Sequence, residues 1–275
     1  MPIGEITAPR RRPEPSAWGS AGPRPVNPHV WCGSATCRGV RHERNEDSVD
    51  WAELSPGLML LGVADGVGGN KRGDRASKVA LRTLFSHVET NVRRTRGCDP
   101  QHLPWLLKAG CEAANRAVRQ LQRSGGDRCS TTLCTALVLG ASHLWIAHAG
   151  DSRGYLLRDG WLRPLTRDHS LVNQLLDGGS LSLDRVDDHP ARKYIVRAVG
   201  RDDHLNVDLT HLPLTPHDAV LLCSDGLWGS LDEDAMARIL RRVAEPEAAC
   251  QTLVSEAIHA GARDDVSAVA WASRL

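Results

Sequence analysis

VADGVGGNKRGDRAS, residues 63–77, is the stretch of this sequence that says most about its fold. The apolar run LMLLGVAD (58–65) leads into it and is typical of a buried strand. Helical periodicity begins at Asp74 and continues to about Glu89. Glycine allows the chain to turn tightly between the two elements. The stretch therefore predicts a strand, a tight loop and a helix, with Asp65 presented where the strand ends.

The rest of the chain contains groups of strands and pairs of helices. Further strand-like runs cover residues 130–140, 142–151, 219–226 and 264–272. Further helical periodicity covers residues 101–123, 168–176, 232–243 and 245–260. The strands follow one another through short turns such as RDGW (158–161). This order predicts an α+β fold with antiparallel sheets rather than a βαβ repeat.

Charge and hydropathy argue against several classes of partner. Among 275 residues, 34 Lys and Arg nearly balance 33 Asp and Glu, so the chain lacks the basic field that nucleic-acid binding needs. No apolar run approaches the roughly 20 residues that cross a bilayer, and the N-terminus has no signal-like apolar core. We therefore expect a soluble, cytoplasmic protein without a nucleic-acid or membrane partner.

The first thirty residues differ from the rest of the chain. They are rich in proline, carry an arginine cluster at 10–12 and contain no leucine and few β-branched residues. Such a segment buries too little apolar surface to offset its ordering entropy. We expect a disordered Pro/Arg-rich tail at 1–30 and one domain at 31–275. The tail could dock a partner, but an idle extension is the simpler interpretation.

The cysteines do not indicate a thiol metal site. Eight of them are scattered along the chain without a C-x-x-C pair or zinc-type spacing. Several lie inside apolar runs, where a free thiol behaves as a small hydrophobic group. We expect reduced, structural cysteines.

Acidic residues recur beside the predicted strands. They are Glu46 and Asp47 in RNEDS, Asp65 in VADGVGG, Asp151 in HAGDSRG, Asp225 in CSDGLW and Asp264 in GARDDVS. If these carboxylates converged without counter-ions, they would repel one another and several would stay protonated. Two hard divalent cations would remove that conflict and could clamp a phosphoryl group. Any single acid–glycine pair is more simply a turn, so only the conjunction favours a metal centre.

The order of these blocks resembles the protein phosphatase 2C family, the metal-dependent serine/threonine phosphatases, and in particular its bacterial branch. The resemblance runs from about Ser34 to Trp271. The blocks that carry it are NEDS (45–48), VADGVGGNKRGDRAS (63–77), STT (130–132), AGDSRGYLLRDG (149–160), LTRDHSLV (165–172), VRAVG (196–200), LLCSDGLW (221–228) and ARDDVSAV (262–269). The resemblance implies an α-β-β-α sandwich, in which helix pairs flank two antiparallel sheets and metals bind at one edge.

The resemblance also implies a ligand set for two Mn²⁺ or Mg²⁺ ions. Asp65 would bridge both ions, and the Gly66 carbonyl would add a backbone ligand to one of them. The other ion would be completed by Glu46, Asp225 and Asp264.

Two more acidic residues receive roles from the resemblance. Asp47 would hold metal-bound water, and Asp151 together with Asp225 would bind a third, weaker metal. A bridging hydroxide would attack phosphorus directly, without a phosphoenzyme.

The sequence departs from the family pattern in four places. Val67 stands where animal relatives carry a histidine proposed as general acid, and Asn70 replaces a frequent histidine. Asp265 stands where an asparagine is usual and adds a negative charge beside the metal ligand Asp264. The spacing from the upstream arginine to the glutamate of NEDS is one residue longer than usual.

The longer spacing leaves two candidates for the arginine that grips a phosphoryl oxygen. In GVRHERNEDS, Arg41 has the expected G-x-R context and Arg44 lies nearer to Glu46. In a strand, one added residue would turn the Arg41 side chain to the opposite face unless a bulge absorbed the shift. We favour Arg41 with a bulge at residues 42–44. Alternatively, Arg44 or neither arginine contacts phosphate.

The resemblance thus implies an Mn- or Mg-dependent phosphatase for phosphoserine and phosphothreonine proteins, acting as a monomer and opposing a bacterial serine/threonine kinase. The alternative is a catalytically silent member that uses the fold for binding, but all the expected ligands are retained. A role in the kinase switch of a secretion system is a third possibility. We expect substrate choice to reside in a mobile flap at residues 168–200.

Overall fold

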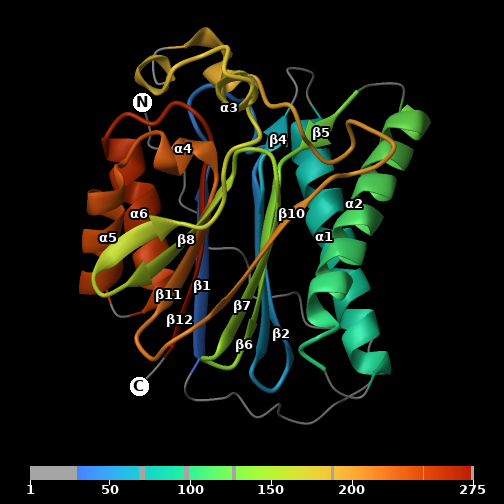
Figure 1. Cartoon of the computed structure of the whole chain (residues 1–275), viewed down its shortest axis with the longest axis vertical. Helices are drawn as coiled ribbons and strands as arrows, with labels where there is room; N and C mark the ends of the chain where they lie inside the picture. Colours follow the sequence, from blue (N-terminus) through green and yellow to red (C-terminus); the bar gives the residue numbers. More distant parts are fainter. Residues whose placement is uncertain are drawn as a thin grey trace.

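Two antiparallel sheets lie face to face in the computed structural model, and helices cover both outer faces (Figure 1). The structure describes residues 30–67, 72–95, 99–125, 128–186, 189–243 and 245–273. This arrangement confirms the predicted α-β-β-α sandwich. The predicted disordered tail lies almost entirely outside the described residues.

The first sheet joins the two ends of the described chain. Its strand order is β1 (Val30–Cys37), β12 (Val266–Ser273), β11 (Ala219–Cys223), β8 (Arg153–Arg158) and β9 (Trp161–Pro164). β1 pairs along its whole length with β12, so the first and last described strands are neighbours. Helices α5 (Glu233–Arg242) and α6 (Pro246–His259) cover its outer face (Figure 1).

The second sheet contains the strand that the opening stretch of sequence predicted. Its strand order is β10 (Asp208–Pro213), β7 (His143–Ala149), β6 (Leu133–Leu139), β3 (Leu58–Ala64) and β2 (Ser48–Ser55). Helices α1 (Gly73–Arg94) and α2 (Leu103–Gly125) cover its outer face (Figure 1). A short pair, β4 (Gly66–Val67) with β5 (Ser130–Thr131), lies at one end.

β3 shows why the central strands read as continuous apolar runs. Every residue of this strand is buried. Leu58 and Leu60 pack in the core beneath α1 and α2, whereas Leu61 and Val63 pack between the two sheets. A strand covered on both faces loses the usual alternation of apolar and polar residues.

Two local details refine the sequence predictions. The turn at 158–161 forms as expected, with positive φ angles of 53° at Asp159 and 82° at Gly160, as a tight hairpin requires. The helix predicted from residue 168 begins at Leu171 instead (α3, Leu171–Asp177). The reason is that the Ser170 side chain accepts the Asn173 N–H and caps the helix there.

The described cysteines are free thiols and nearly all are buried. Burial raises the pKa of Cys111 to about 12, so this thiol stays protonated and inert. This confirms the structural interpretation for the cysteines that the structure describes; Cys98 lies outside them.

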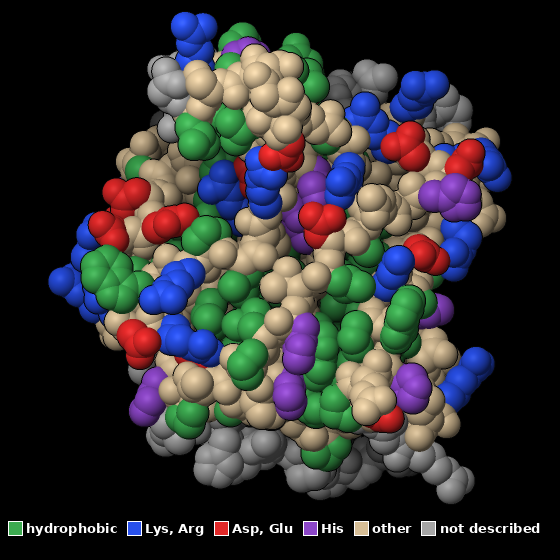
Figure 2. Space-filling view, in the orientation of Figure 1, with side chains coloured by type: hydrophobic (Ala, Val, Ile, Leu, Met, Phe, Trp, Pro, Cys, Tyr) green, Lys and Arg blue, Asp and Glu red, His purple; other side chains and the backbone are tan. Residues whose placement is uncertain are grey.

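The charges on the surface agree with the nearly equal numbers of basic and acidic residues in the sequence. Basic and acidic side chains are interspersed over the face shown in Figure 2, with apolar side chains gathered toward its lower centre. Among the described helices, none combines the length and apolar character needed to cross a bilayer.

Candidate metal centre and active site

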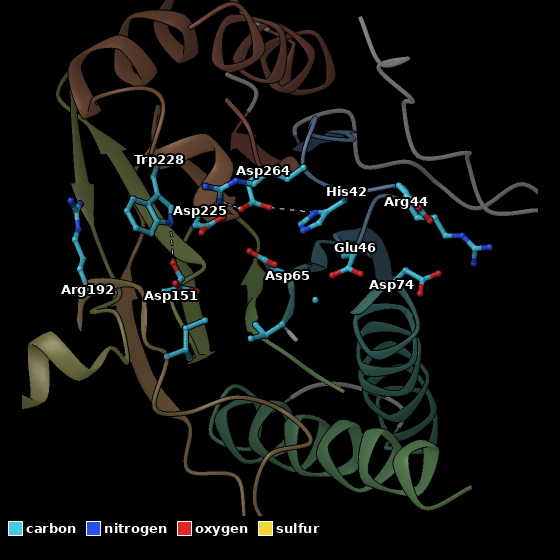
Figure 3. Close-up of a pocket in the computed structure, with 16 residues that line it drawn as sticks. His42, Arg44, Glu46, Asp65, Asp74, Asp151, Arg192, Asp225, Trp228 and Asp264 are labelled. Carbon is cyan, nitrogen blue, oxygen red and sulfur yellow. Dashed lines mark hydrogen bonds and ion pairs between the residues drawn. The ribbon is translucent and has the colours of Figure 1, made fainter. Parts of the chain in front are cut away.

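A cavity of about 800 Å³ opens at the end of the sandwich where strands of both sheets terminate. The acidic residues that line it come from separate segments: Glu43, Glu46, Asp65, Asp74, Asp151, Asp225 and Asp264. Figure 3 shows the carboxylates of Asp65, Asp225 and Asp264 turned toward one another. The structure therefore brings together acids such as Glu46 and Asp264, which lie 218 positions apart in the sequence (264 − 46).

Asp65 follows β3, and its backbone is fixed from both sides. Its N–H donates to the Thr132 hydroxyl at 2.9 Å, and its carbonyl accepts the Thr131 hydroxyl at 2.7 Å and the Thr132 N–H at 2.8 Å. These contacts explain why an STT block accompanies the aspartate. The carboxylate thus projects from a rigid strand end rather than from a loose loop.

Asp225 and Asp264 enter the cavity from the first sheet. Asp225 opens the short helix α4 (Asp225–Trp228) directly after β11, and Asp264 lies two residues before β12. Burial, followed by the charge of Asp264, raises the pKa of Asp225 to about 6. Burial and the charges of Asp47 and Asp225 raise the pKa of Asp65 well above its usual range. The cavity therefore concentrates negative charge that its own residues do not neutralise.

Glu46 reaches the same cavity through a contact that only glycine permits. A Cβ at Gly73, the first residue of α1, would overlap the Glu46 carboxylate. The Glu46 carbonyl accepts the Gly66 N–H at 3.2 Å and the Ser77 hydroxyl at 2.6 Å. The start of α1 and the Gly66 segment thus pack directly against Glu46. Gly68 and Gly69 lie outside the described residues.

Asp47 and Asp151 are two buried acids of the candidate site. Asp47 is 5% exposed, and its Oδ2 accepts the Ser224 hydroxyl at 2.7 Å. Asp151 is 8% exposed, and burial with the charges of Asp225 and Asp168 raises its pKa to about 8. Within the described residues, Oδ1 of Asp47 and Oδ1 of Asp151 have no hydrogen-bond partner. Buried oxygens without donors are positioned to bind a cation.

The residues of the cavity fit hard divalent cations. The donors are carboxylate oxygens and one backbone carbonyl, which suit Mg²⁺ or Mn²⁺ better than zinc. The pKa values of Glu46, Asp65 and Asp225 are raised, which indicates that these acids need positive charge to stay ionised together. Asp74 belongs to this set and was missed in the sequence analysis: it lines the cavity, is 7% exposed and has an unpartnered Oδ1 among the described residues. Its position in the first turn after a glycine-rich loop was the available signal.

Comparison with known proteins now identifies the family. A family model described as protein phosphatase 2C matches residues 38–260. The chain belongs to the protein phosphatase 2C family. Serine/threonine phosphatase stp of Listeria monocytogenes is 33% identical over 84% of this chain and 91% of its own length. Serine/threonine protein phosphatase PstP of Mycobacterium tuberculosis is 33% identical over the same share of this chain, which spans 43% of PstP.

Solved structures of serine/threonine phosphatases share the fold. The M. tuberculosis PstP/Ppp structure superposes with a TM-score of 0.77 at 30% identity, covering 90% of this chain and 100% of that one. A PstP catalytic domain in complex with two manganese ions gives a TM-score of 0.74 at 28% identity, with coverage of 90% and 99%. The protein phosphatase 2C described here is thus a metal-dependent serine/threonine phosphatase.

Arg41 and Arg44 of the phosphatase take different positions at the cavity. Both line the cavity. Arg41 Nη1 lies 3.2 Å from Asp264 Oδ2, whereas Arg44 points away from the carboxylates of Asp65, Asp225 and Asp264 (Figure 3). The predicted bulge at residues 42–44 is wrong. Residues 38–47 form a loop between β1 and β2 rather than part of a strand, so strand alternation does not decide where these side chains point.

Asp265 of the phosphatase does more than add charge beside Asp264. It is 2% exposed and accepts the N–H groups of Gly39 and Glu46, each at 2.7 Å. His42 Nδ1 lies 3.0 Å from the same carboxylate. The added charge is therefore matched by donors, and the residue joins two distant loops.

Trp228 joins three of the sequence blocks beside the cavity. Its Nε1–H donates to the Asp151 carbonyl at 2.9 Å, and the Arg153 guanidinium stacks 3.6 Å from the centroid of its ring. Arg153 in turn pairs with both Asp168 oxygens at 2.8 Å. The start of the predicted flap is therefore tied to Asp151.

The flap itself contains three short helices. They are α3 (Leu171–Asp177), η1 (Leu183–Arg185) and η2 (Pro190–Lys193). The segment is thus partly helical, although residues 187 and 188 lie outside the described part. Arg192 and Ile195 line the cavity wall on the flap side, a contribution that the sequence analysis did not predict.

Proposed function

We propose that this phosphatase hydrolyses phosphoserine and phosphothreonine in cytoplasmic proteins and opposes a serine/threonine kinase of the same cell. One observation carries the proposal: acids from both sheets converge in one open cavity, where burial and repulsion between carboxylates raise the pKa values of Asp65 and Asp225. The cavity is wide enough for a side chain of a protein substrate. We further propose that the protein acts as a monomer.

We propose that Mn²⁺ or Mg²⁺ binds to Glu46, Asp65, the Gly66 carbonyl, Asp225 and Asp264, and that Asp151 with Asp225 holds a third, weaker ion. When bound, the ions supply the positive charge that these carboxylates lack and the Lewis acidity that activates a water nucleophile. In the cavity Asp65 lies between Glu46 on one side and the pair Asp225 and Asp264 on the other (Figure 3). This position suits a ligand that both ions share. Both ions prefer oxygen donors, so this ligand set suits Mn²⁺ and Mg²⁺ alike.

The remaining polar groups would orient substrate and water. The Arg41 guanidinium would donate hydrogen bonds to phosphoryl oxygens, because its planar fork matches their geometry. Asp47 Oδ2 is occupied by the Ser224 hydroxyl, which leaves Oδ1 to accept a proton of the attacking water. Val67 cannot donate a proton, so the alkoxide leaving group would take its proton from solvent in the open cavity.

The test is hydrolysis of an aryl phosphate and a phosphothreonine peptide with and without Mn²⁺. We expect activity that requires Mn²⁺ or Mg²⁺ and is not restored by zinc. Asp65→Asn should lower turnover by more than about tenfold, equivalent to at least about 1.4 kcal/mol of barrier. Asp234→Asn, on the exposed side of α5, is the matched control. Full turnover after exhaustive chelation would exclude the metal-dependent mechanism, and inactivity under all conditions would favour the silent binding module.

A further inference from the structure

The two unusual features near the metal centre meet in one contact. The loop at residues 38–47 contains the additional residue before Glu46, and Asp265 stands where an asparagine is usual. The Asp265 carboxylate contacts this loop at both ends and in its middle: at the Gly39 N–H, the His42 ring and the Glu46 N–H. The longer loop and the extra charge are therefore parts of one arrangement.

Hydrogen-bond chemistry explains why an aspartate suits this position. A carboxylate offers two oxygens that only accept, and Asp265 uses Oδ1 for Gly39 and Oδ2 for both Glu46 and His42. An asparagine would offer one oxygen and turn its NH₂ group toward a donor. Because Asp265 is only 2% exposed, water would not easily replace the lost acceptor.

Two further contacts hold the same loop, one to residue 263 and one within the loop itself. The Arg41 N–H donates to the Arg263 carbonyl at 3.0 Å, and Arg38 Nη1 donates to the His42 carbonyl at 2.6 Å. The loop is thereby fixed on both sides of Arg41. The Arg41 side chain then reaches Asp264 at the cavity. Glu46, at the end of the loop, lines the same cavity (Figure 3).

We propose that His42 and Asp265 act as one positioning unit, which fixes the loop at residues 38–47 so that Arg41 and Glu46 both face the metal centre. Neither residue is assigned a chemical step. The consequence for catalysis rests on the proposed function, because Arg41 is taken to bind the phosphoryl group and Glu46 to bind metal. The positioning itself does not depend on that function.

The experiment compares Asp265→Asn, His42→Ala and the double variant in the full chain. Each single change should raise the KM for a phosphothreonine peptide and the Mn²⁺ concentration for half-maximal activity by about tenfold, as expected when a charged hydrogen bond is lost. In the double variant, KM and the Mn²⁺ concentration for half-maximal activity should rise no further than in the more impaired single variant, because both changes break the same unit. His42→Gln retains an N–H donor and should stay within about threefold of the parent. Asp234→Asn and His102→Ala, on exposed sites, are the matched controls.

Hydrogen exchange provides a readout that does not need activity. In Asp265→Asn, amides of residues 38–47 should exchange at least about tenfold faster, while those of the buried strand β3 stay unchanged. Unchanged exchange in the loop would overturn the proposal, as would single-variant losses that multiply in the double variant. An inactive parent would refute the proposed function alone, since the exchange comparison still decides whether the unit exists.

Discussion

At the scale of single residues, the candidate metal centre gathers more acidic than basic side chains. Asp65, Asp225 and Glu46 all have raised pKa values. Arg41 is half-exposed, at 49% of its side chain, and its ion pair with Asp264 contributes little to stability in water. Its position is therefore better explained by ligand binding than by folding.

Replacing Arg41 should impair substrate binding without unfolding the protein. Arg41→Ala is expected to raise KM and lower kcat/KM by roughly 10- to 100-fold, as for the loss of about 1.5–3 kcal/mol of charged hydrogen bonding. Arg44→Ala is the matched control and should stay near wild type, because Arg44 points away from the carboxylates of Asp65, Asp225 and Asp264 (Figure 3). Steady-state kinetics on a phosphothreonine peptide measures both. If Arg44→Ala instead lost most of its kcat/KM, Arg44 rather than Arg41 would be the residue that binds phosphate. If both variants kept nearly full kcat/KM, the ions alone would bind phosphate.

The sequence predicted which acidic residues belong to the site, but not which contacts the site residues make. Glu46, Asp65, Asp151, Asp225 and Asp264 were all expected at one centre, and they line one cavity. The role of Asp265 was not predictable, because its partners lie 219 to 226 positions away in the sequence. No local pattern specifies which backbone N–H groups such a carboxylate will meet.

At the scale of elements, the start of helix α1 limits the space available to the Glu46 carboxylate. Gly73 belongs to the first turn, next to the buried Asp74, and the Glu46 carboxylate occupies the space where a side chain would begin. Helix propensity alone would favour alanine there. The glycine is therefore required by the site rather than by the helix.

Gly73→Ala should damage the metal centre although alanine is the better helix former. The new methyl group would displace Glu46, so we expect kcat/KM to fall by at least about tenfold and the Mn²⁺ requirement to rise, with little loss of thermal stability. Arg75→Ala, on the exposed side of the same turn, is the control. Steady-state kinetics at a series of Mn²⁺ concentrations tests this. Equal kcat/KM and equal Mn²⁺ requirement in Gly73→Ala and the parent would contradict this account.

Elements with strong periodicity were predicted well, and the connecting segments were not. The long helices and the buried strands formed where the apolar pattern placed them, because burial of one helix face or of both strand faces leaves a clear signature. The segment from Arg41 to Glu46 was interpreted as a strand with a bulge and proved to be a loop. Its conformation depends on hydrogen bonds to Asp265 and Arg263, which no period reveals.

At the scale of the whole molecule, the stability of the metal-free protein should fall as pH rises. The pKa of Asp151 is raised to about 8 and that of Asp225 to about 6. Between their unfolded and folded pKa values such groups bind more protons in the folded state, so their contribution is present at low pH and is lost as pH rises through the folded pKa. Thermal unfolding in chelator should therefore occur at a lower temperature at about pH 8.5 than at about pH 5.5.

Metal should counteract that loss. Ions bind deprotonated carboxylates, so Mn²⁺ should raise the unfolding temperature more at the higher pH. Asp151→Asn removes one of the shifted groups and should flatten the pH dependence of the chelated protein. A chelated protein that became more stable over this range would contradict the assignment of these raised pKa values.

The N-terminal segment should be dispensable for catalysis and folding. Deleting residues 2–28 is expected to leave peptide hydrolysis and thermal unfolding nearly unchanged, because the sequence there has no periodic apolar pattern that could dock on the domain. Unfolding temperature and kcat/KM of the shortened chain test this together. A large loss of stability would show that the segment packs on the sandwich.

The pairing of β1 with β12 has a consequence for how the protein is made. β12 lies between β1 and β11, and Asp264 precedes it by two residues. During synthesis the nascent polypeptide therefore lacks both a central strand of the first sheet and one acid of the metal centre until residues 264–273 have left the ribosome. Translation that stops before residue 264 is therefore expected to yield a product with an incomplete first sheet and an incomplete candidate metal centre, and thus without phosphatase activity.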